Sequence, residues 1–276
     1  MTLKERLYVG RLYNPIGWKL LPTMTRYSYP WMTRRLSPYD VVMMNNGYEE
    51  DPPLGLKLEE SDEPSRYPLQ LYHATATQAG DLTGKRVLEV GCGHGGGASY
   101  LTRTYRPASY TGLDLNSAGI EFCRKRHQIP GLDFVSGNAE HLPFPDESFD
   151  AVINVESSHC YPHLDVFLDE VARVLTPGGH FLYTDSRPKE LLDDWDAALA
   201  TTHLKMISQR DIRLEVMRGM QTRWELASMS KGDQRALKQL FGLRDDMDMK
   251  NGKVYHELET EGFAYRIYLF TKSRAD

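Results

Sequence analysis

The sequence predicts an α/β protein with one doubly wound, mostly parallel, seven-stranded sheet that ends in a C-terminal antiparallel hairpin. Short apolar runs alternate with segments of helical periodicity over residues 85–185, the pattern of parallel strands joined by crossover helices. A glycine-rich turn follows the first apolar run. Near the C-terminus, two further runs are joined only by residues 260–262, and so short a turn predicts antiparallel strands because a parallel pair needs a crossover.

Each predicted element has a local reason. Five short apolar runs bounded by turn residues predict the parallel strands. They cover 86–90, 110–115, 132–136, 150–155 and 180–184. Apolar residues at helical spacing predict helices at 98–105, 117–127 and 164–175. Pro177-Gly178-Gly179 predicts a turn before the fifth strand. The hairpin is expected from residues 253–259 and 263–272.

The chain is expected to divide into an N-terminal lid or cap segment, residues 1–80, and a cofactor-binding domain, residues 81–276. A polar stretch at 186–250 interrupts the alternation and predicts a helical insertion on the acceptor side. Residues 1–35 hold seven basic residues against one acid, with six interleaved aromatics. Residues 40–63 hold eight acids against one lysine, and their prolines predict a loop.

Composition excludes several classes of protein. A formal net charge of -5 argues against nucleic-acid binding, which needs a basic footprint. The three cysteines form no Cys-x-x-Cys pair, so we expect no structural metal and a reducing compartment. No apolar run reaches the roughly 20 residues that cross a bilayer, and the N-terminus lacks the apolar core of a signal peptide. The protein is therefore expected to be cytoplasmic, with peripheral contact to a membrane surface left open.

The glycine-rich turn is the strongest signal for a ligand site. Gly91, Gly93 and Gly96 satisfy G-x-G-x-x-G, which lets backbone approach a cofactor and by itself suggests a dinucleotide in a Rossmann-like fold. Asp114 ends the second strand, eighteen residues after Gly96. An acid there bonds ribose hydroxyls in NAD and in S-adenosyl-L-methionine alike. An NAD-dependent oxidoreductase therefore remains an alternative on these two features.

Later motifs separate the two cofactors. Residues 137–144 resemble the methyltransferase motif that lies against adenine, with Asn138 where the family usually has Asp; the amide oxygen can still accept from the adenine amino group. Residues 149–152 and 174–179 match the motifs around the fourth and fifth strands. Five motifs in order over 85–185 resemble the class I methyltransferases, which use S-adenosyl-L-methionine.

The resemblance implies a set of cofactor-binding residues and no metal ligand. Glu89 is expected to help hold the amino-acid end of the cofactor, directly or through water. The remaining positions belong to the glycine turn and to the residues after the second, third and fourth strands. They are Gly91, Cys92, Gly93, Asp114, Leu115, Asn138, Ala139 and Val155.

Two polar clusters follow strands four and five, where ligands of open α/β sheets bind. Because these strands should be neighbours, His159 and Asp185 could meet beside the transferred methyl group. A histidine oriented by a carboxylate suits deprotonation of an alcohol, and the pair resembles that of sugar O-methyltransferases. It favours a hydroxyl acceptor, although a protonated histidine would equally hold a carboxylate. The alternatives are a loop histidine bonded to backbone and an aspartate that caps the following helix.

Further segments narrow the resemblance to the mycobacterial lipid O-methyltransferases, which include the phthiotriol and phenolphthiotriol dimycocerosate, glycopeptidolipid rhamnosyl and fatty acid enzymes. The matching segments are 49–53, 61–64, 71–78, 93–101 and 158–163. The resemblance implies transfer of a methyl group to an oxygen of a lipid-type acceptor. Residues 1–35 could then be a lid over a lipid chain, lie on an anionic membrane, or form a helix packed on the domain with solvated charges. A non-catalytic cofactor-binding module that regulates lipid synthesis is the other alternative.

Overall fold

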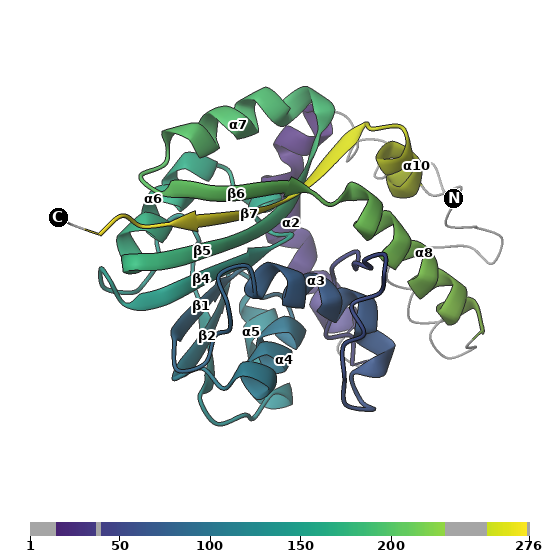
Figure 1. Cartoon of the computed structure of the whole chain (residues 1–276), viewed down its shortest axis with the longest axis horizontal. Coiled ribbons are helices and arrows are strands. Elements are labelled where there is room, and N and C mark those ends of the chain that lie inside the picture. The colour runs from purple at the N-terminus through teal and green to yellow at the C-terminus, as the bar shows by residue number, and fades with distance from the viewer. Residues whose placement is uncertain (1–14, 37–39, 230–252, 275–276) are drawn as a thin grey trace.

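A computed structural model describes residues 15–36, 40–229 and 253–274. Its centre is a seven-stranded sheet in the order β3-β2-β1-β4-β5-β7-β6 (Figure 1). The strands are β1 (Arg86–Val90), β2 (Ser109–Asp114), β3 (Leu132–Ser136), β4 (Phe149–Val155), β5 (Leu175–Pro188), β6 (Lys205–Asp211) and β7 (Phe263–Thr271). Strands β1 to β5 are parallel, and β7 runs antiparallel to both β5 and β6. The predicted doubly wound, mostly parallel sheet is confirmed.

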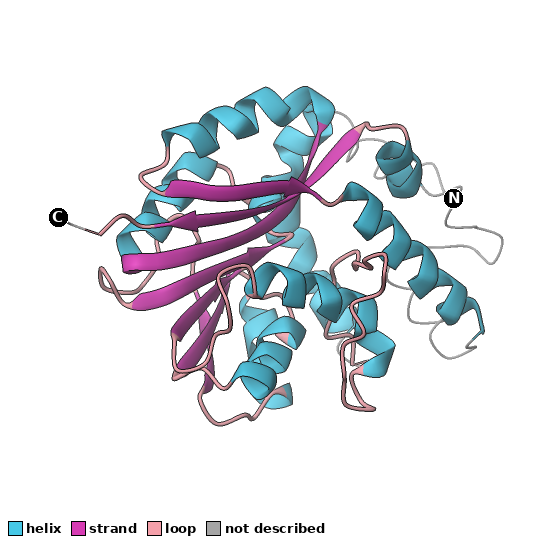
Figure 2. Ribbon diagram, viewed as in Figure 1, coloured by secondary structure: helices cyan, strands magenta, loops and turns pink. Residues whose placement is uncertain are grey.

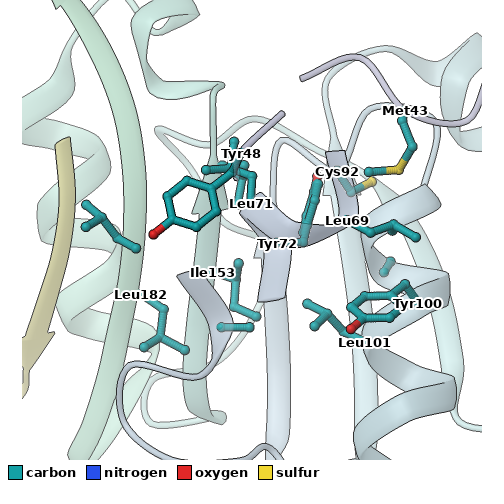
Figure 3. Close-up of a cluster of buried hydrophobic side chains, with 14 of the residues drawn as sticks. Met43, Tyr48, Leu69, Leu71, Tyr72, Cys92, Tyr100, Leu101, Ile153 and Leu182 are labelled. Atoms are coloured by element: carbon teal, nitrogen blue, oxygen red, sulfur yellow. The ribbon is translucent and has the colours of Figure 1, made fainter. Parts of the chain in front are cut away.

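Helices cover both faces of the sheet (Figure 2). They are α2 (Pro15–Leu36), α3 (Arg66–Ala76), α4 (Gly96–Tyr105), α5 (Ser117–Arg126), α6 (Leu164–Val174), α7 (Leu192–Thr201), α8 (Arg213–Met229) and α10 (Lys253–Glu259). One buried cluster joins α3, α4, α5 and α8 to the sheet, and Figure 3 shows part of it. A second cluster joins α6 and α7 to the opposite face. No helix in these described segments is long and apolar enough to cross a membrane.

The predicted hairpin is wrong in its first strand. Residues 253–259 form helix α10, in which Tyr255 and Leu258 share one buried face three residues apart. The second neighbour of β7 is instead β6, which lies inside the stretch 186–250 that was predicted to be helical. Helices α7 and α8 lie in the same stretch, and residues 230–250 lie outside the described part of the chain. All seven residues of β6 are exposed. An edge strand without a buried face has no apolar alternation, so the sequence carries no strand signal there.

Strand β5 is longer than predicted. The run Pro177-Gly178-Gly179, expected to be a turn, lies within β5 next to a register irregularity opposite β4. The extension at the other end places Asp185 inside the strand rather than in the loop after it. The length of β5 matters for the site because it places Asp185 one residue beyond Thr184, the last residue of β5 that pairs with β4.

The N-terminal third contributes to the main core. Residues 41–62 form neither helix nor strand, as their prolines predicted, yet Met43 and Tyr48 are buried in the main cluster, with Tyr48 bonded to α3 and Met43 packed on Gly96 at the start of α4. A Cβ on Gly219 would collide with the backbone of Tyr48, so this glycine lets α8 pack directly on the loop. Helix α2 contacts α5 and the short helix η3 (Ser158–Cys160). The separation of a cap at 1–80 from a domain at 81–276 stays a prediction.

Candidate active site

A cavity of about 380 Å³ lies at the carboxyl ends of the parallel strands, a size typical of small-molecule sites. Its walls come from the glycine turn, the ends of β2, β3 and β4, the loop at 42–45 and helix α2. Most residues predicted from the sequence line it: Gly91, Cys92, Gly93, Asp114, Leu115, Asn138, Ala139, Val155 and His159. Glu89 and Asp185 do not lie on its surface; both are fully buried behind it.

The glycine turn and the loop after β4 are locked together. Gly91 has a φ of 77°, which favours glycine. A Cβ at this position would collide with the side chains of Ser157 and Tyr161. Ser157 and Tyr161 also accept hydrogen bonds from Asn154 Nδ2 at 2.8 and 3.0 Å. This close approach places His159 beside the turn that faces the cofactor.

Asp114 is positioned by backbone donors. Its Oδ2 accepts from the N–H of Gly93 at 2.8 Å, and its Oδ1 accepts from the N–H of Asn116 at 2.8 Å. Burial raises the pKa of Asp114, and these hydrogen bonds oppose the effect. A carboxylate has about four lone-pair sites, so acceptor capacity remains for ribose hydroxyls. The position fits the role predicted for it.

Further polar groups on the cavity wall fit the donors of S-adenosyl-L-methionine. Within the described part of the chain, Oδ1 of Asn45 and Oδ1 of Asn116 are buried without a hydrogen-bond partner. Both residues line the cavity, and an unpaired buried acceptor costs free energy until a donor reaches it. Asn138 Oδ1 accepts from the N–H of Glu140 at 3.1 Å. Its second lone pair could accept from adenine.

Glu89 is one layer away from the cavity. Tyr72 donates to its Oε1 at 2.9 Å and Tyr110 to its Oε2 at 2.7 Å. Burial raises the pKa of Glu89 to about 7, against the lowering effect of these two hydroxyls. Tyr72 itself lines the cavity, so it stands between Glu89 and the cavity space. The role of Glu89 in holding the amino-acid end of the cofactor stays a prediction.

His159 and Asp185 meet. Nδ1 of His159 lies 2.7 Å from Oδ1 of Asp185, and the N–H of His159 donates to Oδ2 at 3.0 Å. The contact forms because β4 and β5 are parallel neighbours and η3 follows β4 directly. Asp185 lies within β5 and does not cap a helix. The imidazole lines the cavity, while the carboxylate behind it is fully buried.

The charges around this pair favour an imidazolium. Burial lowers the pKa of His159, but the adjacent Cys160 and Asp185 outweigh it and raise the pKa well above its ordinary range. Burial alone would raise the pKa of Asp185, but His159 and Arg187 hold it below its usual range. Arg187 lies 3.2 Å from Asp185, and Ser158 donates to the same carboxylate at 2.5 Å. The aspartate is therefore a permanent anion behind the histidine.

Glu156 is a cavity residue that was not predicted. It follows β4 with a φ of 47°, an uncommon conformation for a non-glycine residue that often marks a functional site. Its carboxylate accepts from the backbone and side-chain amides of Asn46 at 2.9 and 3.0 Å. Burial raises its pKa to about 7. Its place directly after the fourth strand was a signal, whereas nothing in the sequence marked the loop at 42–45.

Three other histidines near the glycine turn or the predicted helices are bonded within the protein or lie outside the cavity wall. His94 lines the cavity, but its Nε2 contacts Thr33 Oγ1 at 2.8 Å and its Nδ1 contacts the carbonyl of Val41 at 2.7 Å. His163 is the N-cap of α6. His73 contacts the hydroxyls of two tyrosines and does not line the cavity. Within the described residues, no group of three His, Cys, Asp or Glu side chains could hold a metal ion.

Comparisons with known proteins agree with this geometry. Residues 88–183 match the methyltransferase domain family. The chain is 59% identical over 279 residues to the fatty-acid O-methyltransferase of Mycolicibacterium smegmatis, covering 99% of each chain. It is 55% identical over 247 residues to the phthiotriol/phenolphthiotriol dimycocerosates methyltransferase of Mycobacterium tuberculosis, covering 90% of this chain and 91% of the relative.

Solved structures share the fold at low identity. The [4+2]-cyclase SpnF superposes with a TM-score of 0.66 at 20% identity, covering 94% of this chain and 97% of its own. Geranyl diphosphate methyltransferase, solved with GPP and sinefungin, gives 0.64 at 17%, covering 91% and 99%. Because this fold also occurs in a cyclase, the assignment depends on the sequence relatives. At 59% identity over nearly its whole length, the chain belongs to the S-adenosyl-L-methionine-dependent methyltransferases, as the motifs predicted.

Proposed function

We propose that this protein transfers a methyl group from S-adenosyl-L-methionine to an oxygen of a lipid-type acceptor, and that this oxygen belongs to the carboxylate of a fatty acid. One observation carries the choice of carboxylate: His159, on the cavity wall, is backed by the buried anion Asp185. A cationic imidazolium in that position binds a carboxylate by a charge-assisted hydrogen bond. The relative named as a fatty-acid O-methyltransferase matches 99% of the chain, which supports this choice.

The residues divide the work between the two substrates. When bound, the cofactor supplies an electrophilic methyl group on a sulfonium. Asp114 would hold the ribose hydroxyls, while the unpaired amide oxygens of Asn45 and Asn116 would accept from other donors of the cofactor. His159 would orient the acceptor carboxylate. A carboxylic acid with a pKa near 4.3 is already an anion at neutral pH, so this chemistry needs no general base.

A hydroxyl on a lipid is the second candidate acceptor. Relatives at 55% identity are named phthiotriol/phenolphthiotriol dimycocerosates methyltransferases, and they cover 90% of the chain. A hydroxyl must lose its proton during transfer, so His159 would have to react as the neutral imidazole. The buried carboxylate of Asp185, 2.7 Å from Nδ1, instead favours the protonated imidazole. This is the reason to prefer the carboxylate.

The test is a panel of acceptors at equal chain length. The purified protein is incubated with radiolabelled cofactor and a fatty acid, the corresponding fatty alcohol, or a deoxysugar lipid. We expect base-labile methyl ester from the fatty acid and little product from the others. Methylation of only the alcohol or the sugar would overturn the choice of carboxylate. Cofactor binding in calorimetry without turnover on any acceptor would favour the non-catalytic module instead.

The rest of the proposal concerns location and the N-terminal segment. We place the protein in the cytoplasm with peripheral contact to a membrane, and we assign acceptor selection to α2 and the 186–250 stretch. Five residues of α2 line the cavity: Pro22, Thr25, Arg26, Tyr29 and Pro30. The centre of the Trp18 ring lies 5.6 Å from the centre of the His159 ring. These contacts support an acceptor-side role for the helix.

A further inference from the structure

Helix α2 has two faces with different surroundings. One face carries Trp18, Thr25, Tyr29 and Thr33, spaced as residues of a single helical stripe. Thr25 and Thr33 are buried, and Tyr29 lines the cavity. Thr33 also accepts from Asn116 Nδ2 at 2.8 Å, next to the cofactor wall. This face therefore closes the cavity.

The opposite face is exposed and apolar. Leu20, Tyr27 and Trp31 are 51%, 74% and 59% exposed, and they are among the largest exposed hydrophobic side chains in the described part of the chain. Their spacing of seven and four residues places them within about 40° of each other around the helix axis. Their stripe points away from the stripe that contains Thr25. Three large apolar side chains aligned in this way form a continuous strip in solvent rather than scattered exposure.

All the charged residues of this helix are basic. Its 22 residues contain Lys19, Arg26, Arg34 and Arg35 and no aspartate or glutamate, although the whole chain carries a net charge of -5. The three arginines are exposed. The guanidinium of Arg35 lies 4.9 Å from the centre of the Trp31 ring. Aromatic rings interleaved with arginines are typical of helices that lie at the interface of an anionic membrane.

We propose that the exposed face of α2, defined by Leu20, Tyr27, Trp31, Arg34 and Arg35, docks the protein on an anionic lipid bilayer. The helix would then serve both purposes left open by the sequence: its inner face closes the cavity and its outer face lies on the membrane from which a lipid acceptor is taken. The inference builds on the proposed lipid acceptor. Its central readout, binding to vesicles, needs no turnover and so can be tested independently.

The experiment is flotation of the full-length protein with vesicles of phosphatidylcholine, with and without phosphatidylglycerol. We expect binding only to the anionic vesicles, weakened by salt. At about 1 kcal/mol for each arginine near the surface, Arg34→Ala/Arg35→Ala should weaken binding roughly 25-fold. Tyr27→Ser/Trp31→Ser should weaken it at least about tenfold, because each ring loses a buried apolar contact.

Matched variants control for charge and exposed area. Lys57→Ala/Lys125→Ala removes two exposed positive charges elsewhere on the chain. Leu214→Ser on α8 removes an exposed apolar side chain away from α2, with 56% of the residue exposed compared with 59% for Trp31. Neither control should change vesicle binding. Equal losses in the controls, or equal binding to both kinds of vesicle, would overturn the proposal.

Two further readouts separate the remaining outcomes. With a short-chain fatty acid dispersed in water, the variants on the exposed face should keep the wild-type kcat, whereas methylation of a vesicle-borne acceptor should fall with binding. Sedimentation tests the competing occupant: a dimer that dissociates on Tyr27→Ser/Trp31→Ser would make this face a contact between copies and refute membrane docking. Vesicle binding with no methylation of any lipid would leave the docking inference intact and refute the proposed function.

Discussion

Replacing His159 distinguishes a charge that holds the acceptor from a base that activates it. His159→Gln removes both functions, and His159→Lys restores only the positive charge. The carboxylate of Asp185, 2.7 Å behind the imidazole, remains paired with Arg187 in either variant. A charge-assisted hydrogen bond contributes about 1.5–3 kcal/mol, which corresponds to a roughly 10- to 150-fold change in binding. We expect His159→Gln to raise KM for a fatty acid by this factor, with a smaller effect on kcat, and His159→Lys to recover much of the loss.

The assay is steady-state methylation of a fatty acid and of the matching alcohol, with His163→Gln as the control, since this histidine is exposed and does not line the cavity. The pH profile gives an independent check. Because the pKa of His159 is raised, the charge is present below that pKa, and KM of the wild type should increase as pH rises through it. A fall in kcat of about 10²–10⁴ with unchanged KM, not recovered by lysine, would identify a general base and refute the reasoning.

Three other substitutions test residues that bind the cofactor or support the cavity wall. Asp114→Ala should weaken cofactor binding at least about tenfold in calorimetry, since it removes hydrogen bonds to ribose; unchanged affinity would mean that Asp114 does not contact the cofactor. His94→Gln should reduce the loss of thermal stability at acid pH. Burial lowers the pKa of His94 in the folded protein, so its contribution to stability is present above the pKa of the unfolded chain and is lost as pH falls through the pKa of the folded state. An unchanged profile would exclude His94 as a source of that loss. Arg187→Met should cost about 1–3 kcal/mol in urea unfolding, because it removes one of the two cationic partners of the buried carboxylate of Asp185 and leaves only His159. An unchanged free energy of unfolding would show that Arg187 does not stabilise this carboxylate.

The sequence predicted those parts of the fold that have a buried face. Strands β1 and β3 were predicted at their observed bounds, because short apolar runs next to turn residues indicate buried strands in an alternating α/β pattern. Strand β6 and helix α10 were missed for opposite reasons. β6 is exposed on both faces and has no periodic pattern of apolar residues. α10 is only 7 residues long, so the helical spacing of its apolar residues cannot be told from the alternation of a strand.

The same distinction applies to the site. Asp114 and His159 were predicted because Asp114 ends β2 and His159 comes soon after β4, both at the ligand-binding edge of the sheet. Asn45 was not, because its position depends on a loop that packs back over the glycine turn by tertiary contact alone. Glu89 was predicted from its place in a motif to help hold the cofactor, directly or through water, and that role stays a prediction; its side chain accepts hydrogen bonds from Tyr72 and Tyr110. Strand direction can be inferred from the pattern, whereas the depth of a side chain cannot.

The hydrogen-bond chain from Asn116 through Thr33 to His94 has a kinetic consequence. It ties α2 to the cofactor side of the cavity, while Trp18, at the other end of the same helix, lies beside His159. One helix thus borders both the cofactor side and the His159 side of the cavity, and its displacement would open the two sides together. Exchange of spent cofactor and escape of methylated product then share a single conformational event. We therefore expect release of products, rather than transfer of the methyl group, to limit turnover, with a burst in the first cycle of the reaction.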